Sequence, residues 1–514
     1  MKRAMRTFTS LLLVVVVGTL LGVLVLNLAP ALLHRPATAD PTPATPAATP
    51  DVAPASATAL EPLGTGEGAD GTLPASAALE KKLDAAFGAG SGGSYTADVI
   101  DLATGKELYS RHGDQASAPA SNLKILTAVA ALQHLGGERT LPTTAMLGSD
   151  DTVVLVGGGD VLLGAGSSEP EATVSRAGLG TLAKQTAAAL FASGHFDPGT
   201  STHLQVVLDD TLFTGADLNP VWDESLMATS NITAVQPLAM YGARKDGHPK
   251  SVRVPDPAMA AATTFRTALD AAVAAEQRRA DAAGPAAAAN DGTPDAASGT
   301  GTKPADAAVP RLAVDDGVVR GEAGAGAETL AVVHSAPVLD QLAFMGAESD
   351  NYVAEAMGRL AALAAGRPAT FGGATDTLRA TAAGLGVDME GMSLADASGL
   401  SDRNRISPRQ LTAVIRAAAT SPNADLRDVS YLLPISGATG TLEHRLGAAA
   451  TRGEIRAKTG TLAGIATLGG TAVTAEGRVL AFAFFGHGFD GSLGPARDGL
   501  DRAAAVLAGC GCTP

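Results

Sequence analysis

Two residues with the chemistry for nucleophilic catalysis stand at the start of an apolar run. Ser121 and Lys124 are three positions apart in the stretch SNLKILTAVAAL. On a helix, such neighbours have Cβ atoms about 5 to 6 Å apart, so the lysine amine can reach the serine hydroxyl. A serine attacks once a base takes its proton, and a lysine can be that base when burial or a nearby cation lowers its pKa. We therefore expect Ser121 to be a nucleophile and Lys124 its base.

Two later stretches contain the other groups that acyl transfer needs. Ser349 and Asn351 form an S-x-N triplet at a break between two predicted helices, and Lys458 opens the sequence K-T-G-T beside predicted strands. Ser349 and Asn351 can relay a proton and hold a substrate amide. Lys458 adds a second cation, which lowers the pKa of Lys124 by like-charge repulsion.

The K-T-G-T stretch is predicted to bind the substrate. The hydroxyls of Thr459 and Thr461, together with Lys458, suit a carboxylate. Gly460 has no side chain, so the backbone can approach a ligand closely there. The backbone N–H groups of Ser121 and Thr461 are expected to form an oxyanion hole.

Each of these motifs also has a plain structural interpretation. An S-x-x-K match is expected by chance about once in a chain of this length, and it can be a helix N-cap followed by a solvated lysine. K-T-G-T can be a turn between strands. A second S-x-N triplet, Ser421 to Asn423, follows a predicted helix and is typical of a helix stop. The order S-x-x-K, S-x-N, K-T-G is found in penicillin-binding proteins and β-lactamases, which favours the catalytic interpretation of all three.

Composition excludes several classes of function. The chain has 514 residues, a formal net charge of −15, one Trp and five Tyr. Without a basic stripe it lacks the electrostatic footprint of a nucleic-acid-binding protein. Its nine histidines show no H-E-x-x-H or C-x-x-C companion spacing, so no metal site is predicted. The two cysteines, Cys510 and Cys512, allow only a local pair, and the sequence leaves its redox state open.

The N-terminal region is predicted to direct export. Lys2, Arg3 and Arg6 precede an apolar run over residues 11–28, the layout of a signal peptide or membrane anchor, which we assign to residues 1–33. A retained anchor is slightly favoured over cleavage after the small residues at 37–39, and either outcome places the rest of the chain outside the membrane. Residues 34–77 are rich in Pro, Ala and Thr and are expected to be a disordered linker.

The chain resembles the serine D-alanyl-D-alanine carboxypeptidase/endopeptidases of the class C low-molecular-mass penicillin-binding proteins, in their actinobacterial, high-GC Gram-positive form. The resemblance covers residues 78–514 and rests on SNLK, SDN and KTGT, and also on LVGGGDVLL, DASGLSDRNRISPRQL, LLPISGATGTLEHRL and the terminal CGC. It implies an α/β (α+β) fold, in which a penicillin-recognising domain has a five-stranded antiparallel sheet flanked by helices. The family's roles fall without substitution on Ser121, Lys124, Ser349, Asn351, Lys458, Thr459 and Thr461.

The same resemblance implies a domain organisation. Residues 78–137 and 336–514 are expected to form the DD-peptidase (β-lactamase-like) domain. Residues 138–335 are expected to form one or more inserted α/β domains. Within the insertion, residues 271–308 are mostly Ala, Asp, Gly, Pro and Thr, which predicts a low-complexity surface loop that the family pattern lacks.

The function implied is cleavage of the terminal D-Ala-D-Ala bond, or of D-Ala cross-links, in peptidoglycan stem peptides through an acyl-enzyme on Ser121. No cofactor is implied, and β-lactams would acylate the same serine. The protein is expected on the extracellular side of the membrane, or in the cell wall after signal cleavage. One alternative is a serine β-lactamase, which is disfavoured because no E-x-x-L-N-like stretch follows Ser121 at a useful position. The other is a catalytically silent wall-binding homologue, which would require a missing catalytic residue.

Overall fold

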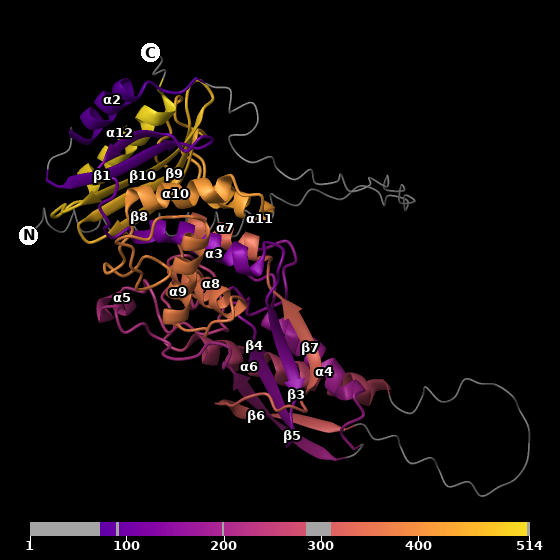
Figure 1. Cartoon of the computed structure of the whole chain (residues 1–514). Coiled ribbons are helices and arrows are strands. Elements are labelled where there is room, and N and C mark those ends of the chain that lie inside the picture. The colour runs from indigo at the N-terminus through magenta and orange to yellow at the C-terminus, as the bar shows by residue number, and fades with distance from the viewer. Residues whose placement is uncertain (1–71, 89–91, 198–199, 284–309, 511–514) are drawn as a thin grey trace, which may run out of the picture. The chain divides into compact units, whose positions relative to one another are not determined.

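The computed structural model describes residues 72–88, 92–197, 200–283 and 310–510. They form two five-stranded β-sheets with helices packed around them (Figure 1). The predicted export segment, residues 1–33, lies outside the described residues, as does the linker up to residue 71. In the part of the chain that is described, no helix has the length and apolar character to cross a membrane.

The first sheet brings the two ends of the described chain together. Every neighbouring pair is antiparallel, in the order β2-β1-β10-β9-β8, so the prediction of a five-stranded antiparallel sheet is confirmed. Strand β10 is almost entirely apolar and buried, as expected for a strand covered on both faces. The strands are β1 (Ser94–Asp101), β2 (Glu107–Arg111), β8 (Ile455–Leu462), β9 (Ile465–Val473) and β10 (Val479–His487).

Helices cover both faces of this sheet (Figure 1). Helices α2 (Ser76–Gly88) and α12 (Gly494–Ala508) pack together on one face, and α10 (Pro408–Ala419) packs on the other. Helix α10 begins with a capping box: the side chains of Ser407 and Gln410 each accept from the other's backbone N–H. Cys510, which follows α12, is disulfide-bonded, and the only other cysteine, Cys512, lies outside the described residues.

A helical layer lies beneath α10 and contains the S-x-x-K motif. Helix α3 (Leu123–Leu135) is buried at every position from Leu123 to Leu132, so it is a central core helix rather than a helix with one apolar stripe. It packs against α8 (Asn351–Ala364) and, with fewer contacts, against α7 (Val338–Glu348) and α9 (Phe371–Gly384). The short elements η2 (Ala120–Asn122), α11 (Ala424–Arg427), η4 (Asp428–Leu432) and η5 (Gly440–Leu442) complete this layer.

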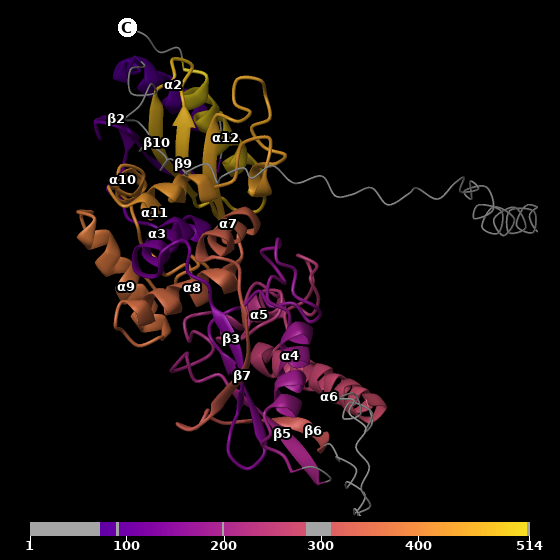
Figure 2. The same ribbon diagram turned by 90° about the vertical axis from the view of Figure 1, so that its right-hand side faces the viewer.

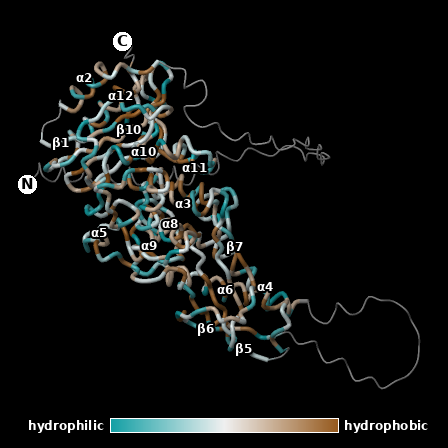
Figure 3. The backbone as a smooth tube through the Cα atoms, viewed as in Figure 1, coloured by the Kyte–Doolittle hydropathy of each residue, from teal (hydrophilic) through white to brown (hydrophobic). Residues whose placement is uncertain are grey.

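The second sheet is mixed, in the order β6-β5-β4-β3-β7, and all its strands lie between residues 142 and 334. Helices α4 (Leu179–Ala192) and α6 (Pro257–Ala283) cover one of its faces (Figure 2). Apolar stretches, brown in Figure 3, occur among the strands of both sheets. The strands are β3 (Pro142–Leu147), β4 (Thr152–Gly157), β5 (Ser201–Asp209), β6 (Arg311–Arg320) and β7 (Glu328–His334); the short helix α5 (Glu224–Ala228) lies between β5 and α6.

The start of the predicted low-complexity loop differs from the structure. The sequence placed it at residue 271, whereas α6 continues to Ala283. Alanine has the highest helix propensity, so an Ala-rich stretch can continue a helix even where it contains few large apolar residues. The remainder of the predicted loop, residues 284–308, lies outside the described residues, and the predicted domain boundaries stay predictions.

Candidate active site

Ser121 and Lys124 are in contact, as their spacing predicts. Ser121 lies in the short turn η2, which leads directly into α3, and Lys124 is the second residue of that helix. The Lys124 Nζ donates a hydrogen bond to Ser121 Oγ at 3.0 Å. Ala120, just before the serine, has a left-handed backbone with φ of 48°. For a residue other than glycine that conformation costs about 1 to 3 kcal/mol, so the surrounding fold must hold the turn in place.

The Lys124 ammonium is enclosed by oxygen atoms. Besides Ser121 Oγ, its Nζ donates to Asn351 Oδ1 at 2.8 Å and to the Ser398 carbonyl at 2.7 Å. The residue is 1% exposed. Burial lowers the pKa of Lys124 to about 8, against the opposing effect of nearby carboxylates, of which Asp396 is the strongest. A lysine with that pKa is neutral in about one tenth of the molecules at pH 7, far more than an ordinary lysine, and can act as a base.

The S-x-N triplet lies at the predicted break between two helices. Ser349 follows the last residue of α7 with a left-handed backbone, and Asp350 caps α8 by accepting from the Val353 N–H at 3.1 Å. Asn351 is the first residue of α8. Its Nδ2 donates to the backbone carbonyl of Asn231 at 3.0 Å, which turns its Oδ1 toward Lys124.

The K-T-G-T stretch lies on β8, the edge strand of the first sheet. Lys458 is fully buried, and its Nζ donates to Ser349 Oγ at 2.8 Å and to the Thr459 carbonyl at 3.0 Å. Burial and the neighbouring Lys124 charge hold the pKa of Lys458 well below its usual range. Two serine hydroxyls, those of Ser121 and Ser349, are thus each paired with a buried lysine.

A cavity of about 310 Å³ opens over these groups. Five of the predicted residues line it, and the side chains of Lys124 and Lys458 donate hydrogen bonds to three of those five. The predicted lining residues are Ser121, Ser349, Asn351, Thr459 and Thr461. The sequence interpretation missed the other five: Asn231, Gly399, Leu400, Thr441 and Leu462. Thr441 lies within the LLPISGATGTLEHRL stretch, and its hydroxyl is 2.9 Å from that of Thr459. The resemblance of that stretch to the family could therefore have indicated that Thr441 lies at the site.

Gly460 has a different environment from the one expected. It is not among the residues that line the cavity. A Cβ at this position would lie 2.1 Å from Thr467 Oγ1, 2.9 Å from the Ala120 Cβ and 3.1 Å from the Pro119 carbonyl oxygen. The missing side chain therefore lets β8 lie directly against the turn that bears Ser121. The space beside Gly460 is occupied by other residues of the protein and is not open to a ligand.

The segment between α5 and α6 is joined to the S-x-N triplet by a buried ion pair. Arg253 Nη2 lies 2.9 Å from Asp350 Oδ2, and both side chains are almost fully buried. Burial alone would raise the pKa of Asp350, but the charges of Arg253 and Arg244 and the Val353 N–H keep it below its usual value. Arg253 Nε also donates to the Ser230 carbonyl at 3.2 Å, next to the residue that orients Asn351.

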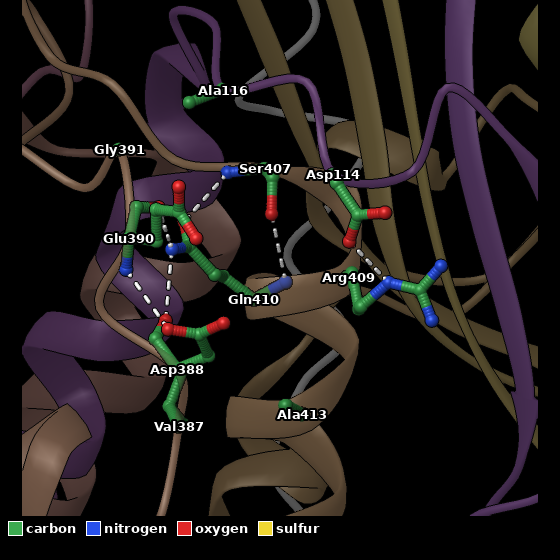
Figure 4. Close-up of a pocket in the computed structure, with 10 residues that line it drawn as sticks. All are labelled: Asp114, Ala116, Val387, Asp388, Glu390, Gly391, Ser407, Arg409, Gln410 and Ala413. Atoms are coloured by element: carbon green, nitrogen blue, oxygen red, sulfur yellow. Dashed lines mark hydrogen bonds and ion pairs between the residues drawn. The ribbon is translucent and has the colours of Figure 1, made fainter.

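A larger cavity, of about 580 Å³, lies at the start of α10 (Figure 4). It contains none of the predicted site residues. Four of its polar residues are paired with one another: Arg409 with Asp114, and Ser407 with Gln410. We therefore place the chemistry in the smaller cavity. The alternative S-x-N triplet, Ser421 to Asn423, is not among the residues that line the smaller cavity, and its Asn423 caps the short helix α11. Among the described residues, no group of three or more His, Cys, Asp or Glu side chains could hold a metal ion.

Comparisons with known proteins found a matching family model, related carboxypeptidases and a solved structure of similar fold. The family model described as "D-Ala-D-Ala carboxypeptidase 3 (S13) family" matches residues 79–300 and 307–507. A carboxypeptidase from Mycobacterium tuberculosis is 34% identical over 430 residues, covering 82% of this chain and 81% of the relative. The D-alanyl-D-alanine carboxypeptidase of Actinomadura sp. (strain R39) is 30% identical over 451 residues, covering 79% and 80%. The crystal structure of penicillin binding protein 4 from Haemophilus influenzae has the same fold, with a TM-score of 0.59, 18% identity and coverage of 82% and 97%.

Proposed function

The chain belongs to the D-Ala-D-Ala carboxypeptidase 3 (S13) family, and we propose that Ser121 is its nucleophile and Lys124 the base that activates it. The protein is a serine carboxypeptidase of the penicillin-binding type. The observation that carries the assignment of residues is the hydrogen bond of 3.0 Å from the buried Lys124 amine to Ser121 Oγ. Once neutral, that amine is within reach of the hydroxyl proton.

Acylation then follows from the groups around the cavity. Lys124 Nζ takes the Ser121 hydroxyl proton while Oγ bonds to the carbonyl carbon of the penultimate D-Ala. The negative charge that develops on the carbonyl oxygen is stabilised by the backbone N–H groups of Ser121 and Thr461. Asn351 holds Lys124 on one side and is placed to hold the substrate amide on the other.

The leaving group needs a proton when the C–N bond breaks. Ser349 Oγ, bonded to Lys458, is placed to donate it to the departing amine of the terminal D-Ala and to regain one from the lysines. Thr459 and Thr461, which line the same cavity, suit the terminal carboxylate. Water then hydrolyses the ester on Ser121 and returns the enzyme to its starting state.

The substrates are peptidoglycan stem peptides, and β-lactams act as inhibitors because they acylate the same serine. Both carboxypeptidase action on chain ends and endopeptidase action on cross-links use this chemistry. The basic and apolar N-terminal sequence supports action on the outer side of the membrane, with residues 1–33 as anchor or as a removed signal. Immunoblotting of membrane, wall and culture fractions, with the N-terminus of each species sequenced, distinguishes these two outcomes.

The cavity also bears on the alternative of a β-lactamase. Rapid hydrolysis of a β-lactam ester needs a base that activates water beside the acylated serine. Among the described residues that line this cavity, none is an aspartate or glutamate. We therefore expect a long-lived β-lactam adduct, and sustained turnover of a chromogenic β-lactam would favour the alternative.

Release of D-alanine tests the proposal. The purified full-length chain is incubated with a synthetic pentapeptide that ends in D-Ala-D-Ala, and free D-alanine is measured. The Ser121→Ala variant is expected to lose activity by about 10³-fold or more. The exposed Ser149 offers a matched control, since Ser149→Ala should leave the rate unchanged. Release of D-alanine by Ser121→Ala at the wild-type rate would overturn the assignment.

A further inference from the structure

A buried glutamate that the mechanism above does not use lies behind Lys124. Glu355 is on α8, four residues after Asn351, so the two side chains leave the same face of the helix. It is 0% exposed. An acidic side chain is rarely buried completely without a partner of opposite charge or a set of hydrogen-bond donors, so its surroundings should reveal its role.

Glu355 positions one of the oxygen atoms around the Lys124 ammonium. Its Oε1 accepts from the backbone N–H groups of Ala397 at 3.1 Å and Ser398 at 2.8 Å. The carbonyl of Ser398 in turn accepts from Lys124 Nζ at 2.7 Å. Helix α8 thus positions two of the three oxygens that Lys124 contacts: Asn351 Oδ1 directly, and the Ser398 carbonyl through the hydrogen bond that the backbone N–H of the same residue donates to Glu355.

The turn at residues 396–401, which Glu355 contacts, has a carboxyl group of its own, that of Asp396. The carboxyl groups of Glu355 and Asp396 differ in their hydrogen bonding. Asp396 accepts four hydrogen bonds, from Trp222 Nε1, Asn404 Nδ2 and the backbone N–H groups of Gly399 and Ser401. The Glu355 Oε2, by contrast, is buried with no hydrogen-bond partner. A buried charge that lacks donors is costly, so the neutral carboxyl form suits this site better than the ionised one. Burial and the Asp396 charge accordingly raise the pKa of Glu355.

We propose that Glu355 is a positioning residue for Lys124 and that the two side chains hold one proton between them. With the proton on the Glu355 carboxyl, Lys124 is a neutral amine and can accept the Ser121 proton. With the proton on Lys124, Glu355 is a carboxylate that stabilises the ammonium, and the serine is not activated. The two forms have the same net charge, so the transfer of the proton leaves the total charge of the buried site unchanged. This inference rests on the roles proposed above for Ser121 and Lys124.

Other charges act on the pair and must be held constant in any test. Lys124 is influenced by Asp396, Asp350, Arg253 and Lys458, and Glu355 by Asp396 and Arg359. A substitution at position 355 leaves all of these in place. A change in the protonation of Lys124 after that substitution therefore reports on Glu355 itself.

The variant Glu355→Gln separates geometry from ionisation. The amide keeps an oxygen for the two backbone N–H groups but cannot exchange a proton at neutral pH. The acylation rate constant of the full-length protein with a chromogenic β-lactam is measured against pH. Removal of a nearby negative charge favours neutral Lys124, so the acidic limb of the profile should move to lower pH by about one unit. A limb that stays at the wild-type pH, whatever the rate, would overturn the proposal.

Two further variants complete the comparison. Glu328→Gln changes an exposed glutamate on β7 and should leave the profile unchanged. Glu355→Asp keeps an ionisable group but is one methylene shorter, so it should lower the acylation rate at every pH by weakening the hold on the turn. A shortened side chain without any effect on the rate would contradict the positioning role.

A measurement on the unmodified protein covers the case in which Glu355→Gln fails to fold. Glutamate labelled with carbon-13 at the side-chain carboxyl is incorporated into the full-length chain, and each carboxyl is titrated by NMR. One glutamate should titrate above pH 6, whereas an ordinary glutamate has a pKa of about 4.3. If all titrate below pH 6, the proposal fails. This titration needs no catalysis, so its result is independent of whether Ser121 proves to be the nucleophile.

Discussion

The buried ion pair between Arg253 and Asp350 allows a sharp prediction, because it joins the segment between α5 and α6 to the S-x-N triplet. Arg253→Met keeps most of the apolar volume of the side chain and removes the guanidinium. Asp350, with a side chain 2% exposed, then loses its partner at 2.9 Å and keeps the more distant guanidinium of Arg244 at 3.4 Å and the Val353 N–H at 3.1 Å. The Ser230 carbonyl loses its donor as well.

The magnitude follows from the burial of the pair. Removing one partner of a buried ion pair costs about 3 to 5 kcal/mol, because the other charge is left unpaired. Since Arg244 still compensates in part, we expect Arg253→Met to lower the free energy of unfolding by about 3 kcal/mol at pH 7. Asp350 has a lowered pKa in the folded protein, so its stabilising contribution is present above its unfolded pKa of about 3.9 and is lost as the pH falls below that value. The difference between variant and wild type should therefore shrink in acid.

Urea unfolding at several pH values measures this effect, together with the acylation rate by a β-lactam. The rate should fall about tenfold, since the segment that orients the Asn351 amide loses its anchor and each factor of ten is about 1.4 kcal/mol. The double variant Arg253→Met/Asp350→Asn removes both charges and should be more stable than Arg253→Met alone. Arg311→Met breaks an exposed pair with Asp281 and should cost less than about 1 kcal/mol. If Arg253→Met costs no more than Arg311→Met, the reasoning is refuted.

Three further predictions concern the site and the first sheet. Because the pKa of Lys124 is lowered to about 8, the acylation rate should rise with pH, reach half of its maximum near that value and then level off. A half-maximum at about pH 10, as for an unperturbed lysine, would contradict the assignment of this base. Gly460→Ala should slow acylation and destabilise the protein by about 1 to 3 kcal/mol, because the new Cβ would lie 2.1 Å from Thr467 Oγ1. The two effects are measured by β-lactam labelling and urea unfolding. Wild-type values in both experiments would contradict the prediction, because they would show that β8 can shift freely. Arg478→Met leaves the Asp101 carboxylate buried without this ion pair and should cost about 3 kcal/mol in unfolding experiments. The folded fraction should keep its acylation rate, because β9 separates β1 and β10, at whose ends the pair lies, from β8, which bears the cavity residues Thr459 and Thr461; a loss of rate in the folded fraction would contradict this.

Local sequence patterns predicted the parts of the site that depend on local geometry. The spacing of Ser121 and Lys124 placed them in contact because a helical turn fixes neighbours three residues apart. The helix break at Ser349 and the strand at Lys458 were also evident from local periodicity. That these segments meet around one cavity was expected from the order of the motifs, and the structure brings them together.

Contacts between distant segments were not predictable in the same way. Asn231, Arg253 and Glu355 each act through a partner about 40 or more residues away along the chain, and no short motif specifies such a pairing. Gly460 was interpreted from its own flexibility, whereas the turn that occupies the space beside it comes from residues far earlier in the chain. The extent of α6 was misjudged because an Ala-rich composition fits both a loop and a helix.

The central claim is that Ser121 becomes covalently bound to the acyl group with help from Lys124. Its most direct test is mass spectrometry of the full-length protein after brief exposure to a β-lactam, with the adduct mapped by peptide sequencing. We predict one adduct per chain, of the mass of the intact β-lactam, on Ser121, and far slower labelling of Lys124→Ala. An adduct on another residue, or labelling of Ser121→Ala at the wild-type rate, would contradict the claim.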